Sequence, residues 1–170
     1  LLRNKWLSPL LLLLIALPGS SRAAESPSFH LASQEEGRSA LAVRDEFVER
    51  LSPFDRAARL KTAADITEHR YLEFVRSNVL SWEDEASTTR VSRALKSVAR
   101  RLGDLGIALP GNILIVRTTG LEEGSAAYTR GNAIVLPDTV LKDSHQDLVK
   151  VISHETFHVL TRSSKTLRTR

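Results

Sequence analysis

The sequence contains no cysteine and no methionine, and only 5% of its 170 residues are aromatic. The lack of cysteine excludes disulfide bonds, thiolate metal sites, a cysteine nucleophile and a lipidated cysteine. Long apolar runs are scarce as well: the longest covers roughly 12 residues near the start of the chain, whereas a membrane-spanning helix needs about 20. The length is sufficient for one domain with a substantial core.

Acidic and basic residues are close to balance. Lys and Arg number 24 and Asp and Glu number 20, which gives a net charge of +4. Three of the basic residues, Arg3, Lys5 and Arg22, lie in residues 1–23, which hold no acid, so the remainder has 21 basic and 20 acidic residues. The sequence pI of about 9.8 therefore gives no reason to expect nucleic-acid binding. The arginines in the middle of the chain are interpreted as the solvated face of a helix: Arg90, Arg93, Arg100 and Arg101.

Residues 1–23 have the organisation of a secretory signal peptide. Arg3 and Lys5 precede the apolar run, and Ser21 and Ala23 provide small residues at positions −3 and −1 of a cleavage site. We expect cleavage after Ala23 and export of the remaining chain. The predicted location is therefore secreted or periplasmic, with no stable membrane anchor after cleavage.

The composition divides the exported part into three segments. Residues 24–38 are rich in Ser, Glu and Gly and are predicted to be a flexible leader. Residues 39–110 carry apolar residues at helical spacing and are predicted to form a helical subdomain. The pattern then changes to short β-branched runs at 112–116 and 132–136, which predict strands, followed by a last helix. The predicted fold class is α+β.

The last predicted helix, capped by Ser144, contains the pattern His154-Glu155-Thr156-Phe157-His158. Residues four apart on a helix lie one above the other, so both imidazoles can reach one metal ion. Glu155 can then lie over a water molecule as general base without binding the metal. In an ordinary amphipathic helix these residues would be a polar edge. This helix is apolar nearly all round, so it should be buried, and a buried carboxylate between two histidines needs a partner that a metal ion supplies.

The segment resembles the active-site helix of the zincin metallopeptidases, and the chain is similar to exported bacterial proteins of this type. The resemblance implies that residues 111–170 form a partial zincin-like metallopeptidase domain with Zn²⁺ as cofactor. It implies that His154 and His158 bind the zinc ion and that Glu155 activates water and passes the proton to the leaving amine. The predicted function is hydrolysis of peptide bonds in a peptide or protein substrate.

The resemblance extends to the two predicted strands before the helix. In zincins an edge strand of the sheet binds an extended substrate, and the runs 112–116 and 132–136 match the expected pair. Asn132-Ala133 is similar to the Asn-Ala edge of thermolysin-like enzymes. The resemblance therefore implies that Asn132 and Ala133 contact the substrate.

The sequence departs from the zincins because a third zinc ligand is missing. The positions at which metzincins carry a glycine and a third histidine hold Thr161 and Ser164. Gluzincins use a glutamate from a later helix, and no acid follows the motif here. The resemblance is thus to a gluzincin, and it implies a third ligand beyond Arg170. Upstream alternatives are Glu73 and His69, and a second copy of the chain could also donate a ligand.

Two other functions remain open on the sequence. The first is a non-catalytic exported protein that binds a metal or a peptide through an incomplete site. The second is an exported helical interaction module in which the HExxH pattern is accidental. The zinc content of the purified protein distinguishes the interaction module from the other two. Turnover of an unstructured protein substrate distinguishes the peptidase from the non-catalytic binder.

Overall fold

A computed structural model describes residues 29–163, so the predicted signal peptide lies outside the described residues. In chain order the elements are β1 (Phe29–Leu31), α1 (Gln34–Leu41), α2 (Glu46–Arg50), α3 (Pro53–Arg59), α4 (Glu68–Ser77), β2 (Val79–Leu80), α5 (Glu85–Asp104), β3 (Ile113–Thr118), the 3₁₀ turn η1 (Leu121–Glu123), β4 (Tyr128–Arg130), β5 (Ala133–Pro137), the 3₁₀ turn η2 (Val140–Lys142) and α6 (His145–Ser163). Helices and a mixed sheet confirm the predicted α+β class.

The described strands form one sheet in the order β1-β3-β5-β4. β1 and β5 run parallel to β3 on its two sides, and β4 runs antiparallel to β5. β2 pairs with the last two residues of β3, antiparallel to it and on the side of β1. This order makes β3 and β5 the central strands and leaves β4 at one edge of the sheet.

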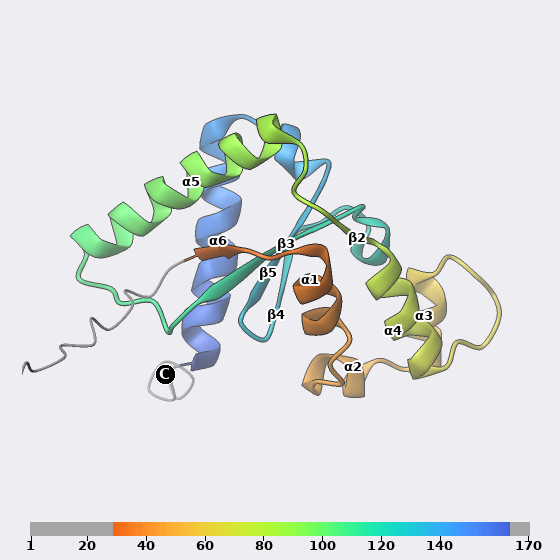
Figure 1. Cartoon of the computed structure of the whole chain (residues 1–170). Helices are drawn as coiled ribbons and strands as arrows, with labels where there is room; N and C mark the ends of the chain where they lie inside the picture. Colours follow the sequence, from red (N-terminus) through yellow and green to blue (C-terminus); the bar gives the residue numbers. More distant parts are fainter. Residues whose placement is uncertain (1–28, 164–170) are drawn as a thin grey trace, which may run out of the picture.

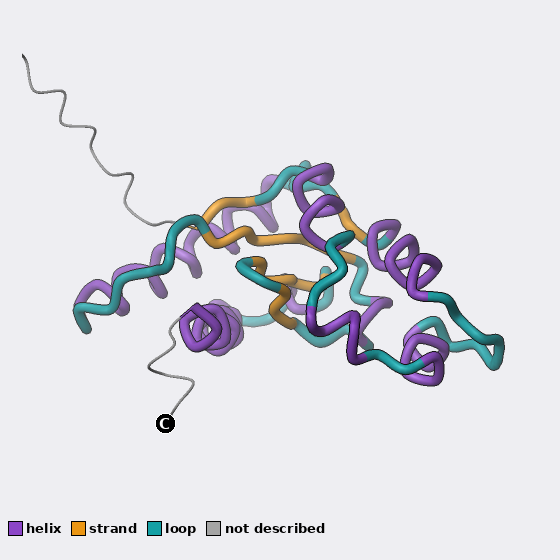
Figure 2. Tube along the Cα trace, turned by 90° about the horizontal axis from the view of Figure 1, so that it is seen from below, coloured by secondary structure: helices purple, strands orange, loops and turns teal. Residues whose placement is uncertain are grey.

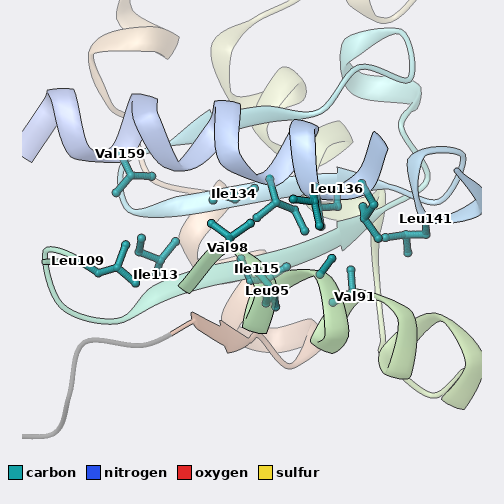
Figure 3. Packing of buried hydrophobic residues seen from close by; sticks show 14 residues of the cluster. Val91, Leu95, Val98, Leu109, Ile113, Ile115, Ile134, Leu136, Leu141 and Val159 are labelled. Carbon is teal, nitrogen blue, oxygen red and sulfur yellow. The ribbon is translucent and has the colours of Figure 1, made fainter. Parts of the chain in front are cut away.

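Helices cover both faces of this sheet (Figure 1), and the alternation of side chains along β3 and β5 explains why. Ile113 and Ile115 of β3 and Ile134 of β5 point to the face covered by α5 and α6, where Figure 3 shows them in one apolar cluster. Val116 and Val135 point to the other face, which α1 and α4 cover. Strands that are buried on both faces have continuous apolar sequences instead of alternating ones, and both β3 and β5 have such sequences.

The predicted flexible leader, residues 24–38, is wrong from Phe29 onward. Phe29–Leu31 pairs with the start of β3, and α1 begins three residues later. A capping box stabilises that start: the Ser33 side chain accepts from the Glu36 backbone N–H at 3.2 Å, and the Glu36 carboxylate accepts from the Ser33 N–H at 2.7 Å. Serine and glutamate therefore mark a helix start here rather than a solvated leader.

The boundary predicted at residue 110 does not separate two cores. The predicted helical subdomain, residues 39–110, contributes β2 to the sheet and helices to both of its faces. Its helical character is confirmed: α5 follows the apolar residues spaced at helical intervals after Asp84, and α3 begins at Pro53 with a capping box at Ser52. Both halves of the chain thus build one packed unit around β3.

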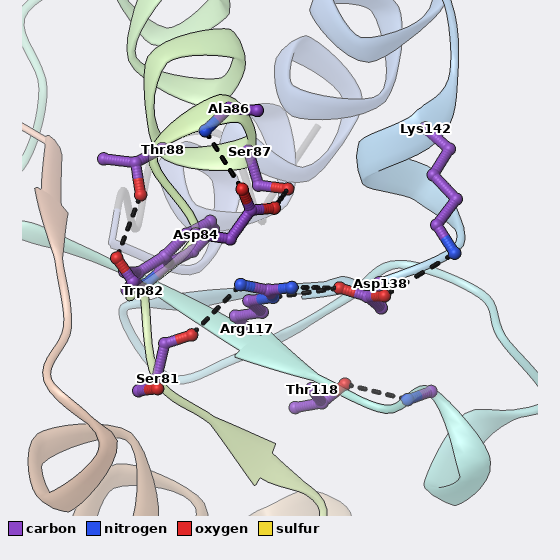
Figure 4. Close-up of polar contacts among 11 residues, drawn as sticks. Ser81, Trp82, Asp84, Ala86, Ser87, Thr88, Arg117, Thr118, Asp138 and Lys142 are labelled. Carbon is purple, nitrogen blue, oxygen red and sulfur yellow. Dashed lines mark hydrogen bonds and ion pairs between the residues drawn. The ribbon is translucent and has the colours of Figure 1, made fainter.

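Arg117 of β3 links the sheet to the start of α5 (Figure 4). Its Nε donates to Asp138 Oδ1 at 2.9 Å and its Nη1 donates to the Ser81 carbonyl at 3.2 Å. The guanidinium also lies over the Trp82 ring, 5.9 Å from the ring centre. Asp84 then caps α5 by accepting from a backbone N–H of its first turn at 3.0 Å. These contacts fix the direction in which α5 leaves the sheet.

Within residues 29–163, no helix is both long and apolar enough to cross a membrane.

Candidate metal centre

The HExxH pattern lies in the second half of α6. Ser144 caps this helix as predicted, because its hydroxyl accepts from the Asp147 N–H at 3.2 Å. Leu148, Ile152 and Val159 are buried in the cluster between α6, α5 and the sheet. Since the helix is fixed by this apolar side, the orientation of the remaining side chains is fixed with it.

The two histidines of the motif converge on one point. His154 Nε2 and His158 Nε2 lie 3.0 Å apart, and the ring centres are 4.6 Å apart in an edge-on arrangement. A tetrahedral zinc ion with bonds of 2.0–2.1 Å separates two ligand nitrogens by about 3.3 Å. The observed separation agrees with that value to a few tenths of an ångström, so both imidazoles can bind one ion without a change of backbone. The same two nitrogens can also share one proton in a direct hydrogen bond.

Glu155 lies beside this pair with its carboxylate buried. The residue is 6% exposed, and its Oε1 is 3.9 Å from His154 Nε2. Its other oxygen, Oε2, accepts a hydrogen bond of 2.6 Å from the hydroxyl of Thr129 on β4. The carboxylate is therefore held between the histidines and the sheet.

Thr129 is a residue of the candidate site that the sequence analysis missed. From the sequence, a metal ion was the expected partner of the buried Glu155 carboxylate. In the structure, the Thr129 hydroxyl on a neighbouring strand donates a hydrogen bond to this carboxylate. Thr129 belongs to a strand of three residues, too short for a recognisable period. The signal available in the sequence was Gly131, because glycine favours a hairpin turn between two strands. In the structure Gly131 has a φ of 55° and follows β4 directly.

The prediction that residues 132–136 form the edge strand is wrong. β5 pairs with β3 on one side and with β4 on the other, so Ala133 is 1% exposed and has no free edge. Asn132 lies in the β4–β5 turn, and its side chain donates to the Asn112 carbonyl at 3.0 Å. The free edge next to Glu155 belongs to β4, which the sequence analysis did not predict as a separate strand.

A pocket of about 420 Å³ opens along the edge of β4. It is lined by Thr129 to Gly131, by Arg162 at the end of α6, and by α2 with its flanking residues. Arg162 Nη1 donates to the Thr129 carbonyl at 3.0 Å. An extended chain could lie in this pocket, within reach of the residue that holds the Glu155 carboxylate.

The described residues offer no third ligand. Within 29–163, no group of three or more His, Cys, Asp or Glu side chains is arranged to hold a metal ion. Glu73 and His69, the upstream alternatives, pair with each other on α4 at 3.5 Å, on the opposite side of the sheet from α6. They are excluded as ligands of this ion in the same chain, because the sheet separates them from it.

The face of α6 that carries the histidines is open. Phe157 is 58% exposed, and its ring lies 6.2 Å from that of His158. A partner could therefore approach the two Nε2 atoms. Comparison of the chain with protein-family models, with curated proteins and with solved structures finds no match.

Proposed function

We propose that this protein is an exported zinc metallopeptidase of the zincin type, in which His154 and His158 hold the metal and Glu155 is the general base. The observation that carries the proposal is the convergence of His154 Nε2 and His158 Nε2 beside a buried carboxylate. The donor set fits zinc, which accepts neutral imidazole nitrogen. The position of these groups next to a free sheet edge favours a peptide substrate.

The chemistry divides between the ion and the chain. Zinc, when bound, acts as a Lewis acid that makes water a nucleophile near neutral pH and polarises a carbonyl group. Glu155 takes the proton that the attacking water loses and then gives it to the amine nitrogen as the peptide bond breaks. Thr129 orients the Glu155 carboxylate through Oε2 and leaves Oε1 directed toward the histidines.

Substrate binding is proposed at β4 rather than at Asn132 and Ala133. The outer edge of β4 has backbone groups that do not pair with β5, and an added strand could use them. Arg162 occupies one of these groups, the Thr129 carbonyl, so a substrate would have to displace or accommodate that side chain. The pocket along this edge provides the room.

The described residues supply only two of the three ligands that a catalytic zinc site uses. We propose that the third ligand comes from outside residues 29–163 or from a second copy of the chain. The same observation favours, as second candidate, a non-catalytic metal-binding role, because two imidazoles hold zinc more weakly than three ligands do.

Zinc binding by the 170-residue chain tests the assignment of the ligands. We expect weak binding that a mild chelator reverses, and loss of that binding in His154→Ala and in His158→Ala. His69→Ala is the matched control, since that side chain is exposed on α4 on the other side of the sheet. Isothermal titration calorimetry with Zn²⁺ measures all four proteins. Equal affinity in His154→Ala and the unmodified chain would refute the ligand pair.

The role of Glu155 is tested in a form of the protein that turns over an unstructured protein substrate. Glu155→Gln should keep zinc and lose about 10²–10⁴-fold in kcat, because a general base contributes by that factor. Glu73→Gln, an exposed carboxylate on α4, serves as control and should change nothing. Near-normal turnover by Glu155→Gln would remove Glu155 from the mechanism while leaving the zinc assignment intact.

A further inference from the structure

The outer face of α5 is strongly basic. Between Arg90 and Arg101 the helix carries five basic residues and no acid. Its apolar side, with Val91, Leu95 and Val98, is buried in the core, so the charged side faces solvent. None of the four basic residues beyond Arg90 forms an ion pair with another described residue: Arg93, Lys96, Arg100 and Arg101. These charges are therefore not neutralised within the described part of the chain.

Two large apolar side chains are exposed directly beyond this basic face. Leu105 is 73% exposed and Ile107 is 40% exposed in the loop that connects α5 to β3. Asp104 is the one acid between Arg90 and Ile107. The loop turns through Gly106, whose φ is 68°, and this turn directs apolar side chains into solvent at the end of a basic helix. We call the combined surface the basic tip: Arg93, Lys96, Arg100, Arg101, Leu105 and Ile107.

The basic tip lies where the chain enters the fold. β1 begins at Phe29, opposite Ile113 at the start of β3, and β3 follows the loop of the basic tip. Figures 1 and 2 agree that the end of α5 projects on the same side of the molecule as the start of β1. The chain before Phe29 therefore joins the fold at the end that carries the basic tip.

We propose that the basic tip docks the protein on a membrane surface that contains anionic lipids. Lysine and arginine side chains gain about fivefold in affinity each near such a surface. Leucine and isoleucine at the end of the helix gain by entering the boundary between headgroups and acyl chains. A nucleic acid would use the basic residues but would leave Leu105 and Ile107 in water, so the combination favours a membrane. The proposal is independent of the peptidase assignment.

Because the chain has no cysteine, one introduced thiol can report on the basic tip alone. Ala108→Cys, exposed beside Ile107, carries an environment-sensitive fluorophore. Ala63→Cys, exposed in the loop between α3 and α4 at the other side of the molecule, carries the same label as control. The full chain is mixed with vesicles of phosphatidylcholine, either alone or with phosphatidylglycerol. We expect a blue shift at position 108 with the anionic vesicles only, and none at position 63.

Charge and apolar contact are then removed separately. Arg100→Gln with Arg101→Gln should weaken binding to anionic vesicles about 25-fold, at about fivefold per cation. Leu105→Ser with Ile107→Ser should weaken it roughly tenfold. The charge-matched control is Arg70→Gln with Arg76→Gln, two exposed arginines on α4 without ion pairs in the described residues, which should leave binding unchanged.

Three results would overturn the proposal. An equal blue shift with phosphatidylcholine alone would attribute binding to the apolar run before Phe29. Unchanged binding of the Arg100 and Arg101 variant, with circular dichroism identical to the parent chain, would exclude the basic tip. Binding to duplex DNA without binding to anionic vesicles would identify the partner as a nucleic acid instead.

Discussion

The two faces of the sheet are stabilised in different ways. On one face the long helices α5 and α6 pack through an aliphatic cluster that continues across β3 and β5. On the other face the helices α1 to α4 have five to ten residues each. Helices that short are marginal on their own in water. They are stabilised by side-chain caps at their starts and by arginine contacts, for example Arg130 with Asp45 and Arg59 with Glu123.

The candidate site lies on the face that depends on apolar packing. Glu155 and the two histidines take their positions from α6, and the one cross-element hydrogen bond to the Glu155 carboxylate comes from Thr129, within the described residues. The opposite face has specific polar contacts and holds neither the two histidines nor Glu155, although α2 lines the pocket along β4. The comparison indicates that the arrangement of the histidines and Glu155 tolerates changes among the short helices as long as the sheet remains folded, whereas the pocket along β4 depends on α2.

The largest effect is expected from Asp45→Ala on the face of the short helices. The side chain of Arg130 is 2% exposed, and it donates through Nε to Asp45 Oδ2 at 2.6 Å and through Nη2 to the Val43 carbonyl at 2.8 Å. Its Nη1 is buried without a partner in the described residues. Loss of Asp45 leaves this buried charge unpaired and removes the cap of α2. We expect a loss of about 3 kcal/mol in the free energy of unfolding, measured by urea denaturation.

Glu46→Ala is the matched control for that measurement. Glu46 is the next residue and pairs with Arg50, but both side chains are about three-quarters exposed. An exposed pair on a helix surface contributes little, so this variant should unfold close to the unmodified chain. If both variants lost the same stability, the buried pair would not be what stabilises this face.

A smaller effect on stability is expected when one glycine on each face of the sheet is replaced by alanine, which adds a single methyl group. A Cβ at Gly37 of α1 would lie 2.9 Å from methyl groups of Val116 and Val79, so α1 approaches the sheet too closely for a side chain. Gly37→Ala should cost about 1–2 kcal/mol, because overpacking exceeds the gain in helix propensity. At Gly103 of α5 no atom lies within 4 Å of the added Cβ. Gly103→Ala should therefore stabilise the protein by about 0.5–1 kcal/mol.

Thermal unfolding followed by circular dichroism compares the two alanine variants directly. Opposite signs are the expected result, since the same substitution meets packed methyl groups in α1 and open space in α5. A stabilising Gly37→Ala would show that α1 can move away from β3 at little cost. The two faces would then be equally adaptable.

The long elements were predictable from the sequence, and the short ones were not. The helical periodicity of residues 83–105 is long enough to identify α5. The β-branched runs that end at Val116 and Leu136 are long enough to identify β3 and β5. β1, β2 and β4 have two or three residues each, too few for a period of two to be visible. The capping pair Ser33 and Glu36 was a readable signal for α1, but the surrounding polar composition favoured a leader.

The site was predictable as far as it lies on one helix. The spacing of His154 and His158 determines that their rings converge, and the structure confirms this geometry. Zinc binding and catalysis stay predictions. The contribution of Thr129 depends on which strand becomes the edge of the sheet, and strand order is a property of the whole fold rather than of a local pattern. The interior position of Ala133, for which the resemblance implied an edge strand, has the same cause.

The smallest effect concerns a buried acid on the face of the short helices. Glu122 in η1 is completely buried, with the Tyr128 hydroxyl 3.4 Å from Oε1 and no hydrogen-bond partner for Oε2 in the described part of the chain. Burial raises the pKa of Glu122 above the ordinary value of 4.5, and the neighbouring carboxylate of Glu123 adds to the shift. The folded state therefore holds this proton more tightly than the unfolded chain does.

Glu122→Gln replaces the protonated acid by a neutral side chain of nearly the same volume. The stabilisation from the bound proton is fully present below pH 4.5 and is lost as the pH rises through the raised pKa of the folded state. Urea denaturation at a series of pH values should thus show the unmodified chain losing stability relative to Glu122→Gln as the pH increases. Glu83→Gln, which removes an exposed carboxylate before α5, controls for the change in net charge. Parallel stability curves for the unmodified chain and Glu122→Gln would mean that the pKa of Glu122 is the same in the folded and the unfolded chain, which would contradict the shift caused by burial.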